Sequence, residues 1–156
     1  MHVTVLCGGK GTRLGADRPK CLVEVAGRPF IEHKLDQLRQ QGATAFQLAV
    51  GPYGADFAYL GLTMILDLQT GITGCRDWLK GWWTMGDALF TDPPEIWARK
   101  SSPLYLVKKA GGNVGGLYED CGLYRGTNWN RILHVPGRMY TINTPEDLED
   151  TRAAMD

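Results

Sequence analysis

A short apolar segment that runs directly into a glycine-rich turn most constrains what this chain can fold into. Val3–Cys7 has the β-branched and apolar character of a buried strand, and glycine occupies positions 8, 9, 11 and 15. Glycines let backbone N–H groups approach an anion closely, and successive N–H groups form a concave anion-binding nest. Arg13 and Lys20 add two cations to the same segment. The pattern therefore predicts a polyphosphate-binding loop at the end of a buried strand.

Two commoner glycine loops do not fit this segment. A Walker A loop requires G-x-x-x-x-G-K-[ST], which these residues do not supply. A dinucleotide-binding loop requires G-x-G-x-x-G, but the spacing from Gly9 through Gly11 to Gly15 is one residue too long. That fold also needs an acidic residue at the end of the second strand, whereas the candidate strand 45–50 runs into Gly51-Pro52-Tyr53. These features argue against a dehydrogenase.

Size and composition narrow the remaining classes. The chain has 156 residues and a net charge of zero, which predicts a single domain over residues 1–156 without the basic surface of a nucleic-acid-binding protein. No apolar run reaches membrane-spanning length, and the N-terminus lacks a signal-peptide pattern. The four cysteines include no C-x-x-C pair, so reduced thiols and a cytoplasmic location are expected. The three histidines are isolated and expected to be structural or surface residues.

Alternating strand and helix patterns predict an α/β fold. One helix is expected to begin at Pro29 and to stop at Gly42, and another is expected to begin at Pro145 behind a Thr144 cap. Such alternation is typical of a three-layer sandwich with a mainly parallel sheet, whose ligands bind at the carboxyl ends of the strands. Strands are expected over residues 3–7, 46–50, 62–68, 82–85 and 104–108, and a short helix over 73–80.

Three separated blocks resemble the signature of the sugar-phosphate nucleotidyltransferases, also called NDP-sugar pyrophosphorylases. The blocks are Gly8-Gly-Lys-Gly-Thr-Arg-Leu14, Pro19-Lys20-Cys-Leu22 and Gly27-Arg-Pro29. The spacing of the first two blocks is most similar to N-acetylglucosamine-1-phosphate uridylyltransferases, whereas residues 25–33 look more like heptose-1-phosphate guanylyltransferases. The resemblance implies a single nucleotidyltransferase domain with the Rossmann-like, GT-A-like fold of that family. It leaves the nucleotide base open.

The resemblance also implies a reaction. Members of the family join a nucleoside triphosphate to a sugar 1-phosphate, which is a step of nucleotide-sugar biosynthesis. The acceptor phosphate attacks the α-phosphorus in line, and pyrophosphate leaves. Because two anions must meet, such a site needs cations and a divalent metal, here expected to be Mg²⁺, rather than a general base. The implied partners are these two substrates, with no nucleic acid and no membrane.

The glycine-rich segment supplies the residues expected to act on the phosphates. By resemblance, Arg13 would hold the leaving pyrophosphate through its planar guanidinium, and Lys20 would bridge the α-phosphate and the incoming phosphate. Thr73 and Gly74 lie in a segment that resembles the family's Gly-Thr-Gly, although Thr70-Gly71 fits as well. The residues expected to bind the nucleotide are Leu6, Gly8, Gly9, Gly11, Thr12, Gln69, Thr73 and Gly74.

The expected metal ligands lie in two other segments. Trp82-Trp-Thr-Met-Gly-Asp87 resembles the family's apolar strand ending in Gly-Asp, whose carboxylate binds Mg²⁺. Residues 140–148 resemble the family's block ending in Thr-Pro-Glu-Asp-Leu, but Thr141 stands where an aspartate commonly completes the metal site. Asn143 is the expected substitute.

The acceptor side of the site is less well defined. Lys109 and Asp120 are the expected acceptor-binding residues, from looser resemblances to the family's Glu-Lys-Pro and Asn-Ala-Gly-Ile-Tyr segments. The nucleotide-binding part is expected at about residues 1–90 and a reduced acceptor-binding part at about 91–156, because the chain is shorter than usual members of the family.

Two alternatives stay open. One is nucleotidyl transfer to another phosphorylated acceptor, such as a phospho-alcohol or phosphocholine. The other is a non-catalytic nucleotide-binding module, which the intact Arg13, Lys20 and Asp87 oppose. Apolar surface left by the shortened middle of the chain could support a homo-oligomer.

Overall fold

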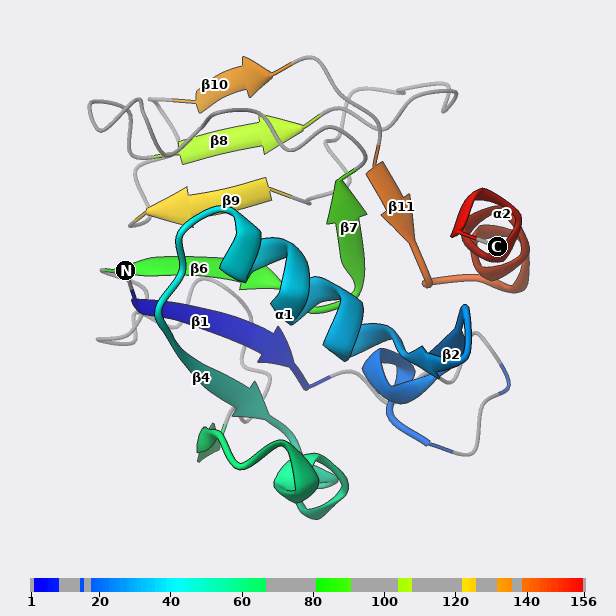
Figure 1. Ribbon diagram of the computed structural model, residues 1–156, viewed down its shortest axis with the longest axis horizontal. Helices are drawn as coiled ribbons and strands as arrows, with labels where there is room; N and C mark the ends of the chain where they lie inside the picture. Colours follow the sequence, from blue (N-terminus) through cyan, green and yellow to red (C-terminus); the bar gives the residue numbers. More distant parts are fainter. Residues whose placement is uncertain are drawn as a thin grey trace.

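A seven-stranded sheet organises the part of the chain that the structure describes. The computed structural model describes residues 2–8, 15, 18–66, 81–90, 104–107, 122–125, 132–135 and 139–155. The strand order is β10-β8-β9-β6-β1-β4-β5 (Figure 1). Its strands are β1 (His2–Cys7), β4 (Ala45–Val50), β5 (Thr63–Leu66), β6 (Trp82–Met85), β8 (Leu104–Val107), β9 (Gly122–Arg125) and β10 (Ile132–Val135).

The sheet is mainly parallel. β1 pairs in parallel with β4 and β6, β4 pairs in parallel with β5, and β8 pairs in parallel with β10. Only β9 runs antiparallel to its two neighbours within the described sheet. The predicted α/β class with a mainly parallel sheet is therefore confirmed. The predicted helix over residues 73–80 lies outside the described residues.

Two short antiparallel pairs stand apart from the main sheet. β2 (Glu24–Val25) and β3 (Arg28–Pro29) form a hairpin whose two turn residues, Ala26 and Gly27, both have positive φ. This conformation at both positions is what a two-residue primed turn requires. β7 (Ala88–Phe90) turns away from β6 and pairs with β11 (Met139–Thr141) (Figure 1). The sequence patterns did not predict β2, β3, β7, β9, β10 or β11.

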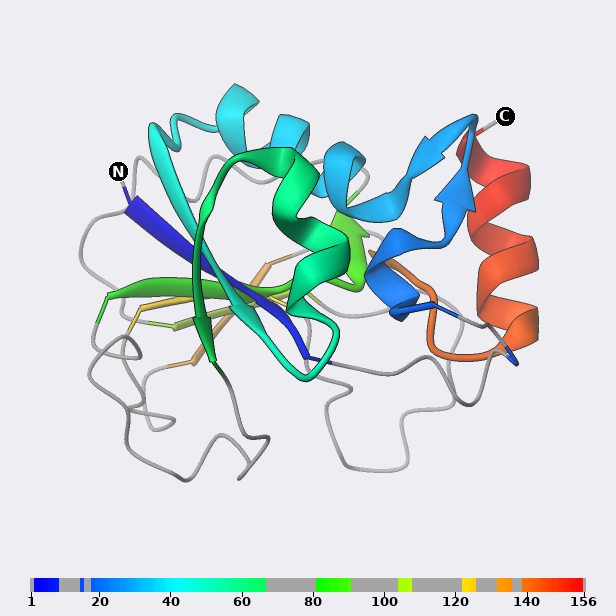
Figure 2. The same ribbon diagram turned by 90° about the horizontal axis from the view of Figure 1, so that it is seen from below.

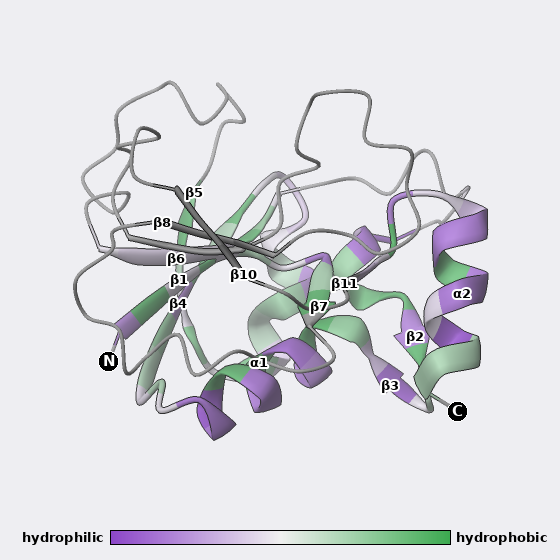
Figure 3. Cartoon of the chain, turned by 90° about the horizontal axis from the view of Figure 1, so that it is seen from above, coloured by the Kyte–Doolittle hydropathy of each residue, from purple (hydrophilic) through white to green (hydrophobic). Residues whose placement is uncertain are grey.

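Helix α1 (Phe30–Gln40) covers one face of the sheet, and Figure 2 shows it on the same side as the 3₁₀ helix η3 (Gly54–Leu60). Its residues Ile31, Leu35 and Leu38 are buried in one core with the alternate side chains of β1 and β4 and with Phe57 of η3. Figure 3 shows the apolar side of α1 toward the sheet and its charged side outward. Pro29 precedes the first helical residue rather than occupying it, because it pairs in the hairpin.

Helix α2 (Pro145–Met155) packs against β11 and also contacts β2. Its predicted cap is confirmed, since the Asp147 N–H donates to Thr144 Oγ1 at 3.1 Å. Thr151, fully buried, donates its hydroxyl hydrogen to the Thr141 carbonyl at 2.8 Å. This bond ties α2 to the end of β11. None of the described helices is long and apolar enough to cross a membrane.

Gly86 allows the end of β6 to lie directly against β1. Its N–H donates to the Leu6 carbonyl at 2.9 Å. A Cβ at this position would stand 2.8 Å from that carbonyl oxygen and 2.9 Å from Cys7 Sγ. Because one obstacle is backbone, the position requires glycine for close approach.

We expect Gly86→Ala to lower the free energy of unfolding by about 2–3 kcal/mol, as an overpacked site does. Gly61→Ala is the matched control: its Cβ would meet nothing within 4 Å, but its φ of 65° should strain alanine by about 1 kcal/mol. Urea unfolding of both variants measures the difference. Equal losses would mean that the close contact at Gly86 is unimportant.

We expect Thr151→Val to lower the free energy of unfolding by about 1–2 kcal/mol, because the buried Thr141 carbonyl loses its donor at nearly constant volume. Thr63→Val, at an exposed strand position, should change stability by less than about 0.5 kcal/mol. Thermal unfolding of the two variants makes the comparison. A wild-type melting temperature for Thr151→Val would show that this bond does not hold α2 to β11.

Candidate active site

Lys20, Asp87 and Asn143 lie in direct contact although they are far apart in the sequence. Lys20 Nζ lies 2.6 Å from Asp87 Oδ2. The same ammonium donates a hydrogen bond to Asn143 Oδ1 at 2.6 Å. We call these three residues the Lys20 cluster. The sequence predicted the lysine as a catalytic residue and the other two as metal ligands, and the structure brings all three together.

The 3₁₀ helix η2 (Lys20–Leu22) holds the backbone of Lys20 in place. The Leu22 N–H donates to the Pro19 carbonyl at 2.9 Å, and the Val23 N–H donates to the Lys20 carbonyl at 3.1 Å. The side chains of Cys21 and Leu22 are buried in the main core. The Lys20 side chain keeps 22% of its surface exposed, so its ammonium reaches the cluster from an anchored backbone.

Asp87 follows β6 in the turn that begins with Gly86. Its side chain is only 7% exposed, and its second oxygen, Oδ1, has no hydrogen-bond partner among the described residues. The carbonyl of Asp87 accepts the Ile142 N–H at 3.3 Å, and the next residue, Ala88, pairs with Thr141. The antiparallel pairing of β7 with β11 therefore carries Asn143 to the carboxylate.

Thr141 contributes a hydroxyl that is also buried and without a hydrogen-bond partner in the described part of the chain. It replaces the acid that the family resemblance led us to expect. The Lys20 cluster thus contains one carboxylate, one amide oxygen and one ammonium. Residue 141 adds a neutral hydroxyl nearby instead of a second carboxylate. Within the described residues no three His, Cys, Asp or Glu side chains group as a metal site.

Leu6 and Gly8 lie at the carboxyl end of β1, where the predicted nucleotide loop begins. Gly8 lies against Gly51, the residue after β4, since a Cβ on Gly51 would stand 3.0 Å from the Gly8 carbonyl oxygen. Two neighbouring parallel strands therefore end in closely packed backbone. The other predicted site residues lie outside the described residues: Arg13, Gly9, Gly11, Thr12, Gln69, Thr73, Gly74, Lys109 and Asp120.

Cys7, Cys21 and Lys34 lie close to the Lys20 cluster. The sequence patterns did not predict that these three residues would group together. Cys7 and Cys21 are free and buried, and the hydrogen bond between them, followed by burial, raises the pKa of the Cys7 thiol well above its usual value. The charge of Asp87 acts in the same direction, and the charge of Lys34 opposes it. Cys7 therefore stays protonated, as expected for a structural thiol.

Lys34 is a fully buried lysine on the apolar side of α1. It follows Ile31 by three residues and precedes Leu38 by four, so helical periodicity alone could have placed it on the buried face. His33, on the same helix, contacts the Val25 carbonyl through Nε2 at 2.6 Å, which supports its predicted structural role.

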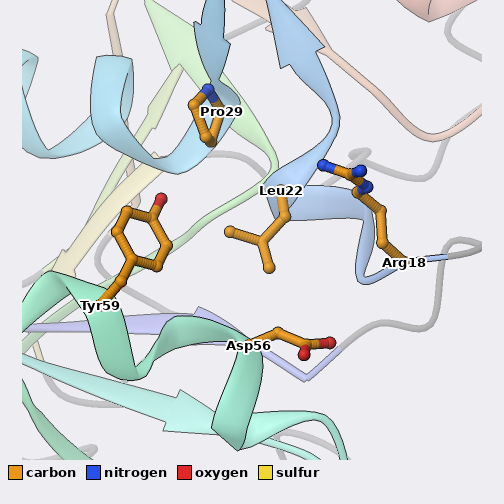
Figure 4. A pocket seen from close by; sticks show the side chains of 5 residues that line it. All are labelled: Arg18, Leu22, Pro29, Asp56 and Tyr59. Carbon is orange, nitrogen blue, oxygen red and sulfur yellow. The ribbon is translucent and has the colours of Figure 1, made fainter.

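A separate pocket of about 390 Å³ lies near η2, lined by Arg18, Leu22, Pro29, Asp56 and Tyr59 (Figure 4). The Tyr59 hydroxyl donates to Glu32 Oε2 at 3.2 Å. Burial, and then the charge of Glu32, raise the pKa of Tyr59 to about 12. None of the Lys20 cluster lines this pocket, and Asp56 gives it an acidic group. Its described charged residues are Arg18 and Asp56, one of each sign.

Comparison with known proteins supports the interpretation of the glycine-rich segment. Residues 3–75 match the MobA-like NTP transferase domain. The bifunctional protein GlmU of Saccharophagus degradans is 41% identical over 56 residues, which cover 36% of this chain and 12% of the relative. GlmU of Xanthomonas oryzae is 28% identical over 142 residues, which cover 91% of this chain. The chain spans only 27% of the length of that relative.

Solved structures share the fold over nearly the whole chain. HddC from Yersinia pseudotuberculosis, complexed with GMP-PN, has a TM-score of 0.67 at 17% identity, covering 99% of both chains. A Bacillus anthracis protein assigned as a glucose-1-phosphate thymidylyltransferase has a TM-score of 0.69 at 14% identity, and the match covers 99% of this chain and 95% of that protein. The CTP:phosphocholine cytidylyltransferase LicC of Streptococcus pneumoniae also has a TM-score of 0.69 at 14% identity, and the match covers 99% of both chains.

At these identities the structural likeness establishes the fold, and the predicted Rossmann-like nucleotidyltransferase fold is confirmed. The domain match over residues 3–75 includes the whole glycine-rich block at residues 8–14. This domain match and the GlmU relatives therefore support the nucleotidyltransferase family for this chain.

Proposed function

We propose that this protein transfers a nucleotidyl group from a nucleoside triphosphate to a sugar 1-phosphate, releasing pyrophosphate. The observation that carries the proposal is the Lys20 cluster, in which one ammonium contacts Asp87 and Asn143 at the carboxyl end of the parallel strands. A cation beside a buried carboxylate and an amide oxygen suits a reaction between two phosphates. Such a reaction needs charge neutralisation and needs no side chain to remove a proton.

Lys20 is proposed to bind the α-phosphate and the incoming phosphate together. Its ammonium is a compact point charge on a flexible stem, so it can follow a phosphoryl group as charge moves. Arg13 is proposed to hold the leaving pyrophosphate, with the glycine-rich loop from Gly8 to Thr12 around the triphosphate. The base is proposed to lie against Leu6, Gln69, Thr73 and Gly74.

Asp87 and Asn143 are proposed to hold Mg²⁺. The residues fit this ion, because a carboxylate and an amide oxygen are hard donors and Asp87 Oδ1 is buried with no hydrogen-bond partner in the described part of the fold. Bound Mg²⁺ would neutralise phosphate charge during the transfer. With few protein oxygens available, the substrate phosphates would supply further ligands, as is usual for this ion.

A different phosphorylated acceptor is the second candidate. The fold matches LicC, a phosphocholine cytidylyltransferase, as closely as it matches the Bacillus anthracis protein assigned to glucose 1-phosphate. An acceptor such as a phospho-alcohol would need the same lysine and metal. Lys109 and Asp120 are proposed to contact the acceptor, within a part at about residues 91–156 that follows a nucleotide-binding part at about 1–90. A cytoplasmic location and a homo-oligomer are compatible with this function.

We expect pyrophosphate release with Mg²⁺ from one combination of a nucleoside triphosphate and a phosphorylated acceptor. A coupled phosphate assay should cross ATP, CTP, GTP, UTP and dTTP with a panel of sugar 1-phosphates, phosphocholine and inositol 1-phosphate. Release with a sugar 1-phosphate supports the proposal, and release only with a phospho-alcohol supports the second candidate. Triphosphate binding without release in any combination would contradict both and favour a non-catalytic module.

We expect Asp87→Asn to lower kcat/KM by about 10²–10³, the usual loss when an electrostatic stabiliser of a transition state is removed. A triphosphate should raise the melting temperature of the wild type more when Mg²⁺ is present. In the variant, Mg²⁺ should make no difference to this rise. Asp56→Asn, which makes the same acid-to-amide change at an exposed residue, should behave like the wild type in both measurements. Retained Mg²⁺ dependence in Asp87→Asn would show that Asp87 is not the metal ligand.

A further inference from the structure

We propose that Lys20 acts as an internal counter-cation for the metal ligands. In the structure its ammonium contacts Asp87 Oδ2 and Asn143 Oδ1, and it must leave Asn143 before a divalent cation binds to both residues. The inference rests on the metal assignment made for the proposed function. It adds a role for the same lysine at an earlier stage than nucleotidyl transfer.

The contacts show why Lys20 and a divalent cation compete. The ammonium takes one oxygen from each proposed ligand, Asp87 Oδ2 and Asn143 Oδ1, at 2.6 Å in both cases. Two cations cannot share these oxygens without strong repulsion, because the Coulomb energy grows as the separation and the local dielectric fall. A divalent cation could use the unpartnered Asp87 Oδ1, but Asn143 has only one side-chain oxygen, and Lys20 contacts it. Binding of the cation to both ligands therefore requires Lys20 to move.

The environment of Asp87 explains why a counter-cation is present at all. A carboxylate with 7% of its side chain exposed loses most of its hydration on folding, and a paired charge offsets that cost. Removing one partner of a buried ion pair is destabilising, because the other charge is left without compensation. Lys20 thus stabilises the charge of Asp87, and a divalent cation would take over the same electrostatic task.

The construction of the site allows the lysine to move while its surroundings stay fixed. η2 is anchored by buried Cys21 and Leu22, so the backbone of Lys20 need not shift. Its side chain is 22% exposed, whereas the Asp87 side chain is nearly enclosed and its turn is bonded to β1 and to Ile142. The flexible lysine stem can therefore carry the ammonium away from a rigid pair of ligands.

The exchange couples metal binding to nucleotide binding. A displaced ammonium without a new partner loses two short contacts, which weakens metal binding in the absence of a nucleotide. A triphosphate supplies anionic oxygens for Lys20, so each ligand should favour the other, as reciprocal linkage requires. The device would keep the ligands neutralised until substrate phosphate is available.

The test is the affinity for Mn²⁺, a spectroscopic substitute for Mg²⁺, measured by electron paramagnetic resonance on nucleotide-free protein. We expect Lys20→Met to bind Mn²⁺ at least about tenfold more tightly than the wild type, because the competing cation is gone. Arg39→Met removes a cation from the surface at the far end of α1 and should leave the affinity within about twofold. Equal or weaker binding by Lys20→Met would overturn the proposal.

Lys20→Gln provides a second neutral side chain, and it replaces Lys20→Met if circular dichroism shows that the latter is unfolded. A non-hydrolysable triphosphate analogue should increase Mn²⁺ affinity more in the wild type than in either variant. An Asp87→Asn change in the Lys20→Met background should abolish the gain. Persistence of the gain would place the metal elsewhere and overturn the proposal.

This outcome is separable from that of the proposed function. Pyrophosphate release with unchanged Mn²⁺ affinity in both lysine variants would leave the function standing and remove the counter-cation role. A tenfold gain that depends on Asp87, without release in any substrate combination, would establish the exchange in a protein that is not a nucleotidyltransferase enzyme.

Discussion

The contact between the Lys20 ammonium and the nearly enclosed carboxylate of Asp87 is the interaction on which the rest of the site depends. A buried carboxylate requires a cation nearby, and here that cation comes from a segment 67 positions earlier in the sequence. Asn143 completes the contact from a third segment. The fold must therefore bring η2, the end of β6 and the end of β11 to one point, and its less regular features serve that arrangement.

Each of those features has an identifiable physical cause. The parallel pairing of β1 with β6 and the missing side chain at Gly86 bring the Asp87 turn against the start of the glycine-rich loop. β7 then pairs with β11 rather than with the main sheet, which carries Asn143 to the carboxylate. The Thr151 hydroxyl holds α2 to the end of β11. The site is thus supported by backbone pairing on one side and by a helix on the other.

The sequence predicted the parts of this arrangement that depend on local patterns. Strands β1, β4 and β6, helix α1 and the Thr144 cap follow from apolar runs, periodicity and capping chemistry. Asp87 was predicted from the resemblance of residues 82–87 to the family's strand ending in Gly-Asp. The β7–β11 pair and the β2–β3 hairpin are too short to show periodicity, and their register depends on contacts between distant residues. The burial of Lys34 also escaped prediction, because a lysine at one position of an apolar face is usually solvated.

The replacement of the family's expected acid by Thr141 changes the charge balance of the described site. With an aspartate there, two carboxylates would exceed the single ammonium and could attract a divalent cation unaided. With threonine, Lys20 and Asp87 cancel, and Asn143 and Thr141 contribute only neutral oxygens. If these residues hold the metal as proposed, its attraction to them would come largely from the negative charge of the nucleotide. On the proposed metal assignment, the neutral balance that suits Lys20 as a counter-cation would also make metal binding depend on the substrate.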